Sequence, residues 1–265
     1  MLFDRIRYFL GVLLIIPVFP IMYFQAKKIR RDFPDLPEAE YPEGESGKPS
    51  SKSILIMGES SVAGVGVDVH ANGIAGQMCK ELAELQGHHF QYTVVAKSGY
   101  TAQRVHQKLL SKVPDQDFDL IMIGLGGNDT FQTKTPWFWQ KHMRILIEGL
   151  HERFPNVPIA VTCMPPVHTF TAFSVLLKFF LGGLTKLHGH EIRRMARELD
   201  YLYYYDYVIT LEEWIDRYEE ATQPSDFFSD GVHPSALTYR IWGKETALFI
   251  HNQVLKGQSA QSKVA

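Results

Sequence analysis

Cysteine is scarce in this chain, with two residues among 265. Cys79 falls on the apolar side of a predicted helix and Cys163 ends a predicted buried strand, so we expect inert core side chains and no disulfide. The sequence also lacks the Cys and His spacings that zinc sites use. The run His188-Gly189-His190-Glu191 is interpreted as the solvated start of a helix. No metal ion is therefore expected.

An excess of charge of either sign is missing as well. Lys and Arg total 27, and Asp and Glu total 29. No basic stripe with interleaved aromatic residues occurs, so nucleic-acid binding is not expected. No internal repeat is present either. With an N-terminal segment and linker set aside, roughly 200 residues remain, which is a comfortable size for a single α/β domain.

One long uncharged run is present near the N-terminus. Residues 8–24, YFLGVLLIIPVFPIMYF, carry no charge and have basic residues on both flanks. This length is at the lower limit for a spanning helix, and no small-residue cleavage site follows, so residues 1–31 are predicted to be a retained membrane segment. Pro17 and Pro20 would kink a helix, which leaves a monotopic, one-leaflet segment as the alternative to a spanning anchor. The positive flank slightly favours a cytoplasmic position for the domain that follows.

The composition changes after this segment. Residues 32–53 are rich in Pro, Glu, Ser and Gly, which is typical of a flexible linker. Residues 257–265 are expected to form a loose tail. The folded domain is therefore predicted to comprise residues 54–256.

Within that domain, strand-like and helix-like segments alternate. Strands are predicted at residues 54–57, 92–96, 120–123, 158–163 and 201–205, and helices at 73–86, 102–110, 137–154, 187–199 and from Pro234 toward Leu255. This alternation predicts a three-layer α/β/α sandwich with a parallel sheet of about five strands. Five strands suit a flavodoxin-like order, in which ligands bind at the carboxyl ends of the strands. The tyrosines of residues 201–205 are interpreted as core and edge packing.

Four short motifs accompany these elements. Gly58-Glu59-Ser60 follows the first predicted strand, Ser98-Gly99 the second, and Gly126-Gly127-Asn128-Asp129 the third, while Asp230-Gly231-Val232-His233 precedes the last helix. Each motif alone is compatible with an ordinary turn or helix cap. In this order, over residues 54–255, they resemble the four blocks of the SGNH hydrolases, also called GDSL-type esterases and lipases.

The resemblance assigns a chemical role to each block. It implies that Ser60 is the nucleophile, that His233 is the general base and then the general acid, and that Asp230 orients the imidazole. The backbone N–H groups of Ser60 and Gly99 and the side-chain amide of Asn128 would form the oxyanion hole. A serine hydroxyl needs such a base, and the base needs an acid partner, so the residue types agree with acyl transfer. No organic cofactor is implied.

The chain departs from the family pattern in the first two blocks. Glu59 stands where the family usually has Asp, and Ala96-Lys97 replaces an asparagine that the family often carries before the glycine of the second block. The first change affects how the turn around the nucleophile is positioned, and the second affects the substrate loop. Neither position is one to which the resemblance assigns a direct chemical role.

A second apolar stretch, residues 170–184, follows Pro165-Pro166. It is interpreted either as a core helix or as a membrane-contacting lip beside the site. Taken together, these features predict a membrane-attached serine ester hydrolase acting on lipid or other acyl esters. Membrane lipid would be contacted through residues 8–24, and also through residues 170–184 where these form the lip and not a core helix. Two alternatives remain open: a deacetylase or acyltransferase acting on a cell-envelope glycan, and a membrane-tethered binding protein without turnover. Glu59 is the one residue that points to the last.

Overall fold

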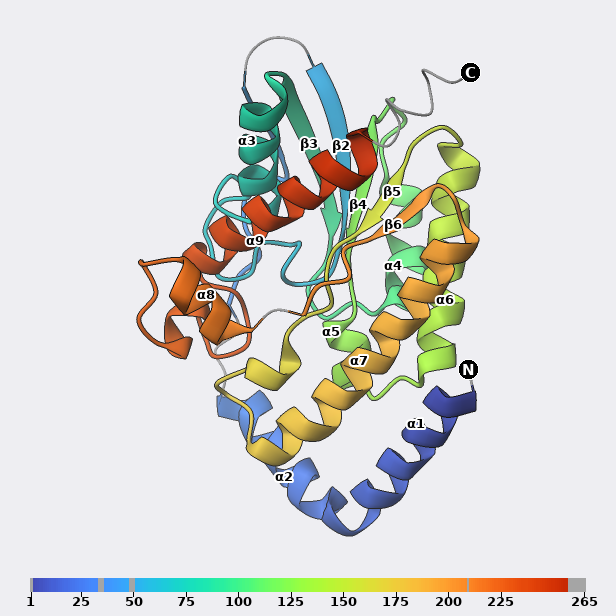
Figure 1. Ribbon diagram of the computed structural model, residues 1–265, viewed down its shortest axis with the longest axis vertical. Helices are drawn as coiled ribbons and strands as arrows, with labels where there is room; N and C mark the ends of the chain where they lie inside the picture. The colour runs from blue at the N-terminus through green and yellow to red at the C-terminus, as the bar shows by residue number, and fades with distance from the viewer. Residues whose placement is uncertain (1, 33–35, 48–50, 209, 257–265) are drawn as a thin grey trace.

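The computed structural model describes residues 2–32, 36–47, 51–208 and 210–256. A six-stranded sheet forms its middle layer, with the order β1-β3-β2-β4-β5-β6 (Figure 1). The five strands from β2 onward are parallel, and β1 pairs with β3 in the antiparallel direction. The strands are β1 (Glu43–Ser46), β2 (Ser51–Gly58), β3 (His89–Ala96), β4 (Leu120–Gly124), β5 (Ile159–Val161) and β6 (Leu202–Tyr204). The predicted flavodoxin-like parallel sheet is confirmed, with one extra edge strand.

Helices cover both faces of this sheet. On one face lie α3 (Ile74–Gln86) and α9 (Ala236–Phe249), and on the other α4 (Ala102–Lys108), α6 (Pro136–Arg153) and α7 (Val175–Glu198) (Figure 1). Two short helices follow strands, α5 (Gly127–Phe131) after β4 and α8 (Leu211–Arg217) after β6. Single turns complete the domain: η2 (Leu110–Lys112), η3 (Val167–Thr169), η4 (Pro224–Phe227) and the π-helical η5 (Ile250–Leu255).

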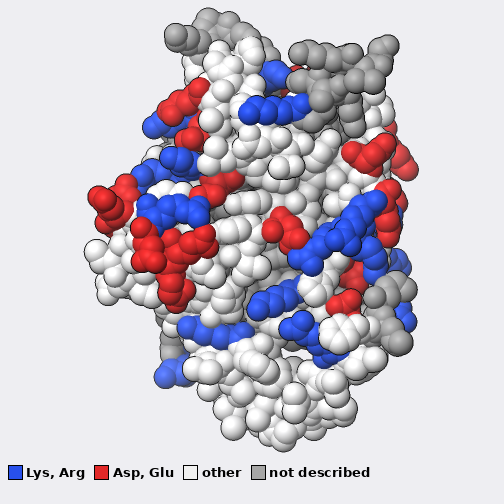
Figure 2. Space-filling view, in the orientation of Figure 1, with Lys and Arg blue, Asp and Glu red and all other residues white. Residues whose placement is uncertain are grey.

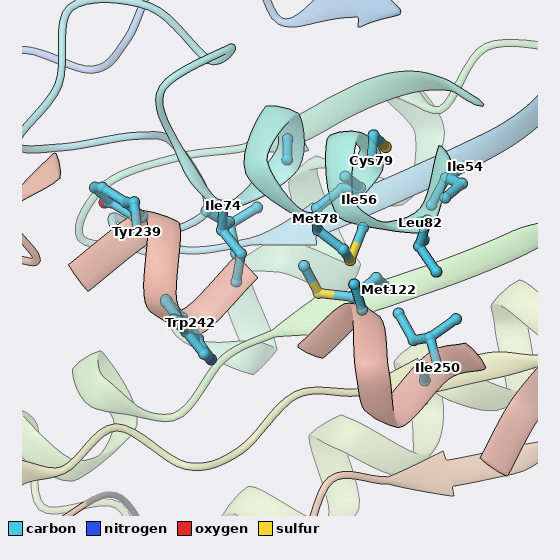
Figure 3. Close-up of a cluster of buried hydrophobic side chains, with 14 of the residues drawn as sticks. Ile54, Ile56, Ile74, Met78, Cys79, Leu82, Met122, Tyr239, Trp242 and Ile250 are labelled. Carbon is cyan, nitrogen blue, oxygen red and sulfur yellow. The ribbon is translucent and has the colours of Figure 1, made fainter. Parts of the chain in front are cut away.

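The alternation of side chains along β2 explains why the core has two halves. Ile54 and Ile56 pack with α3 and α9, while Leu55 and Met57 pack with α4 and α6, and all four are fully buried. Figure 3 shows the first half, where Met78 of α3 and Met122 of β4 meet the side chains of β2. Because both faces of the strand are covered, the sequence shows a continuous apolar run.

The register of the central strands brings the sequence motifs together. Gly58, the last residue of β2, pairs with Ala96 of β3 on one side and with Gly124 of β4 on the other. The three strands therefore end at the same level, and the segments that follow them meet at one edge of the sheet. In Figure 1 this carboxyl edge points toward the N-terminal helices.

Helix α7 differs from its prediction. It begins at Val175 instead of residue 187, so most of residues 170–184 forms its first half. Ser174 caps it by accepting a hydrogen bond from the N–H of Leu177. The interpretation of residues 188–191 as a solvated helix start is wrong: they lie inside α7, where His188 is fully buried and contacts the carbonyl of Lys134 at 2.9 Å. The buried positions of α7 keep one helical phase from Leu177 to Met195, which makes the segment a single helix.

Part of the segment predicted as a flexible linker is ordered against the domain. Strand β1 lies within it, and the N–H of Ala39 donates to the carbonyl of Ala63 at 2.9 Å. The carboxylate of Glu38 accepts hydrogen bonds from the N–H of Ser98 at 2.6 Å and from the ammonium of Lys97 at 2.8 Å. Backbone pairing and these polar contacts hold the segment, so no apolar pattern marks it. The predicted tail, residues 257–265, lies outside the described residues.

Both cysteines are free and buried, as expected. Burial raises the pKa of both thiols, that of Cys163 to about 12. A thiol that stays protonated at neutral pH is a poor nucleophile, which supports the interpretation of inert core residues.

The N-terminal apolar run forms two helices joined by a turn. They are α1 (Leu2–Ile15) and α2 (Phe19–Asp32), with the 3-10 turn η1 (Ile16–Val18) between them. By length and composition, Phe3–Ile29 is long and apolar enough to cross a membrane. The chain bends at η1, which contains Pro17, so that the two helices form a V (Figure 1). The predicted kink is confirmed.

Candidate active site

The turn after β2 carries Ser60 at the carboxyl edge of the sheet. The N–H of Ala63 donates to the carbonyl of Glu59 at 2.8 Å, and the N–H of Val65 donates to that of Ser60 at 3.0 Å. Gly64 adopts a φ of 73° in this turn, a conformation that glycine reaches without strain. Ser60 is thereby held half-buried at the end of a central strand.

Asp230 and His233 form a hydrogen-bonded pair at the same edge. The Asp230 Oδ2 and His233 Nδ1 atoms are 2.7 Å apart. The other carboxylate oxygen accepts the backbone N–H groups of Val232 at 2.9 Å and His233 at 2.7 Å. Burial alone would raise the pKa of Asp230, but the hydrogen bonds from His233 and Val232 outweigh it and hold the pKa below its ordinary value. The ionised carboxylate fixes the ring, and Nε2 is left for proton transfer.

Ser60 and His233 line one cavity. It encloses about 660 Å³, including the open space at its mouth. Apart from its polar end, its wall is largely apolar and aromatic, formed by Phe131, Met164, Pro165, Pro166, Phe170, Leu211, Trp214, Phe227, Phe228, Val232 and Trp242. Among the described residues no hydrogen bond links Ser60 to His233. Such contacts often tighten only when substrate binds.

The two remaining oxyanion candidates lie at neighbouring strand ends but do not line this cavity. The Asn128 side-chain amide donates to the carbonyl of Tyr100 at 3.2 Å. Gly99 is exposed, with a φ of 78°. Gly127, the neighbour of Asn128, does line the cavity. Gly99 and Asn128 therefore lie at the same edge of the sheet as Ser60, but their N–H donors do not line the cavity that Ser60 lines.

Glu59 has a contact that sequence analysis missed. Its carboxylate is buried and accepts the backbone N–H of Gly127 at 2.6 Å and that of Asn128 at 2.7 Å. The first motif is thus bonded directly to the third. The longer side chain that departs from the family pattern has a definite partner, and it fixes the backbone of the residue whose amide is an oxyanion candidate.

Asp129 links the third motif to the start of α4, just after the second motif. It is fully buried, and its Oδ2 accepts the N–H of Ala102 at 2.8 Å. Burial raises the pKa of Asp129 to about 6. Burial also raises the pKa of Glu59, and the nearby Asp129 carboxyl raises it further. The hydrogen bonds from the N–H groups of Asn128 and Gly127 lower this pKa, and the net effect is a pKa of about 7. Two buried carboxyls therefore link the third motif to the first motif and to the start of α4.

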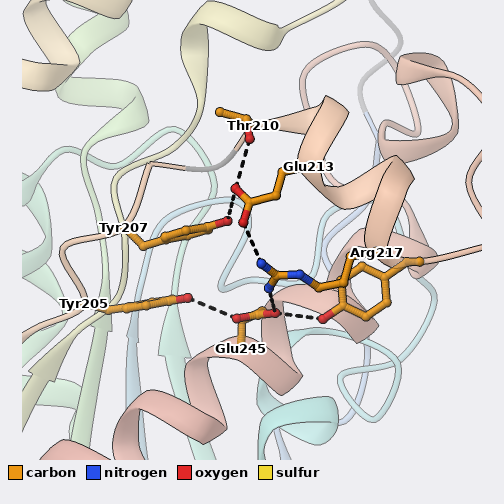
Figure 4. Close-up of polar contacts among 7 residues, drawn as sticks. Tyr205, Tyr207, Thr210, Glu213, Arg217 and Glu245 are labelled. Atoms are coloured by element: carbon orange, nitrogen blue, oxygen red, sulfur yellow. Dashed lines mark hydrogen bonds and ion pairs between the residues drawn. The ribbon is translucent and has the colours of Figure 1, made fainter.

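Helix α8, which the sequence analysis did not predict, supplies Leu211 and Trp214 to the cavity wall. A polar cluster holds this helix against the sheet and α9 (Figure 4). Tyr205 donates to Glu245 at 3.3 Å, and Tyr207 donates to Glu213 at 2.8 Å. Arg217 bridges the two carboxylates. Leu211 and Trp214 are spaced three residues apart around the acidic pair Glu212-Glu213, and this is the sequence signal that could have indicated α8.

Within the described ranges, no group of three or more His, Cys, Asp or Glu side chains is placed to hold a metal ion.

Comparison with known proteins decides the family. A model of the GDSL-like lipase/acylhydrolase family matches residues 56–241, which is well over half of the chain. The chain belongs to this family. The match includes the first motif from its strand through Ser60 and the last through His233, and it places the protein in the SGNH hydrolase superfamily. No match was found among curated proteins.

Solved structures of GDSL and related proteins share the fold. A lipolytic G-D-S-L protein from Veillonella parvula is similar with a TM-score of 0.56 at 16% identity, over 77% of this chain and 100% of that chain. The lipase Lip_vut3 from a goat rumen metagenome gives 0.53 at 16% identity, over 74% and 96%. An active-site mutant of a family two carbohydrate esterase from Clostridium thermocellum gives 0.53 at 14% identity, over 78% and 65%. Membership of the GDSL family fits a hydrolase of the esterase or lipase type.

Proposed function

We propose that this GDSL-family protein is a membrane-attached serine ester hydrolase that acts through an acyl-enzyme. The observation that carries the proposal is the Asp230–His233 pair, of which His233 lines an apolar cavity together with Ser60. An acid, a base and a hydroxyl at one cavity are the parts that a serine hydrolase requires.

In the proposed acylation step, His233 Nε2 takes the proton of Ser60 Oγ while Oγ attacks the ester carbonyl carbon. The tetrahedral intermediate then expels the alcohol, which receives that proton from His233. In deacylation, water gives a proton to His233 and attacks the acyl carbon, and Ser60 leaves with the proton restored. Asp230 stays ionised throughout and stabilises the imidazolium.

The negative charge on the intermediate would be met by the N–H groups of Ser60 and Gly99 and by the Asn128 amide. A carboxamide has two N–H donors, so Asn128 can bond the carbonyl of Tyr100 with one and the oxyanion with the other. The hydrogen bonds from Asn128 and Gly127 to Glu59 fix the backbone that carries this amide. One such donor contributes about 3–4 kcal/mol to transition-state stabilisation.

The apolar lining of the cavity supports a substrate whose acyl group is a hydrocarbon chain. Aromatic and aliphatic side chains dominate the wall beyond Ser60 and His233. Burial of each additional CH₂ contributes about 0.8 kcal/mol, or about fourfold in kcat/KM, until the cavity is full. An acetyl group on a glycan would leave most of this wall unused. The apolar N-terminal helices support membrane attachment and hence a lipid or other long-chain acyl ester.

A fluorophosphonate probe tests the chemistry. We expect the wild-type protein and a Ser111→Ala control, changed at an exposed serine, to be labelled, while Ser60→Ala and His233→Ala are not. Labelling that survives Ser60→Ala would refute the assignment of Ser60 as the nucleophile. A wild-type protein that resists the probe would favour a binding protein.

A series of p-nitrophenyl esters from C2 to C12 tests the substrate class. We expect kcat/KM to rise by about fourfold per CH₂ over the first members. A maximum at C2 would favour the deacetylase alternative over the lipid ester.

A further inference from the structure

The N-terminal helices form a hairpin, defined as residues 2–32, whose two arms are both fixed to the catalytic domain. On the first arm, Asp4 Oδ1 lies 2.9 Å from His190 Nδ1 of α7. Tyr8 meets Trp137 of α6 in an edge-on ring contact with centroids 5.0 Å apart. Helix α1 therefore packs on the outer helices of the domain near its own beginning.

The second arm is fixed at the other end of α7. Ser174, the residue that caps α7, donates its hydroxyl hydrogen bond to Gln25 Oε1 at 2.7 Å. Met22 is buried, with 8% of its surface exposed. The first arm thus contacts the domain at Asp4 and Tyr8 and the second at Gln25, and the bend at η1 lies between them, away from the domain (Figure 1).

This arrangement is incompatible with a helix that spans a bilayer. A spanning segment has its two ends on opposite sides of the membrane, whereas Asp4 and Gln25 here bind the same helix of the same domain. Each arm has 14 residues, or about 21 Å of helix. That length falls short of the hydrocarbon core, which is about 30 Å thick.

The surface of the hairpin is nevertheless suited to lipid. Large apolar side chains around the bend are more than half exposed: Phe9, Leu10, Leu13, Leu14, Ile16, Phe19, Ile21, Tyr23 and Phe24. Val175 and Phe179 in the first turns of α7 are 84% and 67% exposed. A soluble monomer rarely shows so much contiguous apolar surface.

Basic residues border this apolar surface on its domain side. In Figure 2 the lower end of the molecule is uncharged, and Lys and Arg side chains lie directly above it. Lys27 and Lys28 follow the apolar part of α2, and both are exposed. Ammonium groups at this level would meet the phosphates of a leaflet while the tip reaches the acyl chains.

We propose that the hairpin is a monotopic anchor, inserted by its bend into one leaflet of a bilayer that contains anionic lipids. The inference rests on the membrane attachment proposed above and is independent of the hydrolase chemistry. Because the carboxyl edge of the sheet points toward the hairpin, the anchor holds the site at the bilayer surface (Figure 1). Phe170 of the cavity wall is four residues from Ser174, which binds the hairpin. The geometry favours esters that enter from the leaflet.

Single cysteines in the full-length chain test the topology, since Cys79 and Cys163 are buried and need not be removed. Phe3→Cys reports the start of the hairpin, Leu13→Cys its bend and Glu45→Cys the domain. Each is treated with a membrane-impermeant maleimide in sealed right-side-out and inside-out membrane vesicles. We expect Phe3→Cys and Glu45→Cys to react in the same type of vesicle and Leu13→Cys to react in neither until detergent is added.

Two outcomes would overturn the inference. Reaction of Phe3→Cys and Glu45→Cys in opposite vesicle types would show a spanning helix, and reaction of Leu13→Cys in intact vesicles would show a bend outside the lipid. Alkaline carbonate extraction of the same vesicles tests membrane attachment separately from the topology of the hairpin. A protein that washes off would refute both the attachment and the monotopic anchor. Fluorophosphonate labelling of Ser60 is read independently, so the hydrolase proposal stands or falls separately.

Discussion

Replacement of Glu59 by glutamine should change how the stability of the protein depends on pH. The Glu59 carboxyl is buried and accepts the N–H groups of Gly127 and Asn128. Glutamine has nearly the same shape but presents an amide NH₂ in place of one acceptor oxygen. One backbone N–H is then left without an acceptor, which costs about 1–3 kcal/mol relative to the protonated carboxyl of the wild type.

The pH dependence follows from the raised pKa of Glu59, about 7 against an ordinary 4.5. The folded protein holds this proton more tightly than the unfolded chain does. The stabilisation is therefore complete below pH 4.5 and is lost as the pH rises through about 7. The displacement from 4.5 to about 7 corresponds to about 3 kcal/mol. Asp129, with its pKa raised to about 6, acts in the same direction in both proteins.

Urea unfolding in detergent at pH 4.5, 6, 7 and 8 measures this effect. We expect the wild-type protein to exceed Glu59→Gln in free energy of unfolding at pH 4.5, and the gap to close by about 3 kcal/mol toward pH 8. Glu84→Gln, at an exposed position of α3, is the control and should follow the wild type. Parallel curves for wild type and Glu59→Gln across this range would refute the assignment of a neutral, buried Glu59.

Three further substitutions address the proposed catalytic parts. Asp230→Asn should lower kcat by about 10³- to 10⁴-fold with little change in KM, because the His233 ring loses the carboxylate that orients it; an effect under tenfold in steady-state ester hydrolysis would contradict this role. Asn128→Ala should lower kcat by about 10²- to 10³-fold, and Asn156→Ala, at an exposed position, should not; equal effects would exclude an oxyanion donor. Gly231→Ala should reduce both stability and kcat, since this residue has a φ of 88° and an added Cβ would lie 3.0 Å from the Cβ of Ala172; unchanged thermal unfolding and turnover would show that the loop has room.

The parallel sheet could be predicted because its strands are buried on both faces. Residues 54–57 and 120–123 are continuous apolar runs, and the motif glycines mark where those strands stop. Strand β1 could not be predicted in the same way. Its sequence, Glu-Gly-Glu-Ser, has no apolar pattern, and the strand is held by backbone pairing with β3.

Helix α7 was predicted as two separate segments, an apolar stretch at residues 170–184 and a helix at residues 187–199. Gly182 and Gly183 interrupt the apolar stretch of residues 170–184, and the predicted helix began only at residue 187. In the structure Gly182 is buried where α7 passes His168, and an added Cβ would lie 3.1 Å from the Cβ of that residue. Gly182 allows this close packing contact, and the helix continues through it.

The sequence predicted the individual residues of the candidate site, but it did not predict the hydrogen bonds that connect the motifs to one another. The order of the motifs indicated Ser60, Asp230 and His233, and the structure places the last two in contact and Ser60 on the same cavity. The carboxylate bonds of Glu59 and Asp129 join loops that lie 27 to 69 residues apart in the chain. Sequence spacing carries no signal for such contacts, because they depend on the register of three neighbouring strands.

The ordered stretch before β2 decides where the chain can be cut to obtain a water-soluble enzyme. Removal of everything before residue 54, the predicted domain boundary, would delete β1 and leave the N–H of Ser98, beside Gly99, without the Glu38 carboxylate. It would also remove the partner of the Ala63 carbonyl in the turn that carries Ser60. A shortened chain that starts at residue 36 removes the apolar hairpin and keeps these contacts. A chain that starts at residue 36 thus loses the apolar hairpin but keeps the contacts of the loops that carry Ser60 and Gly99, whereas a chain that starts at residue 54 loses both.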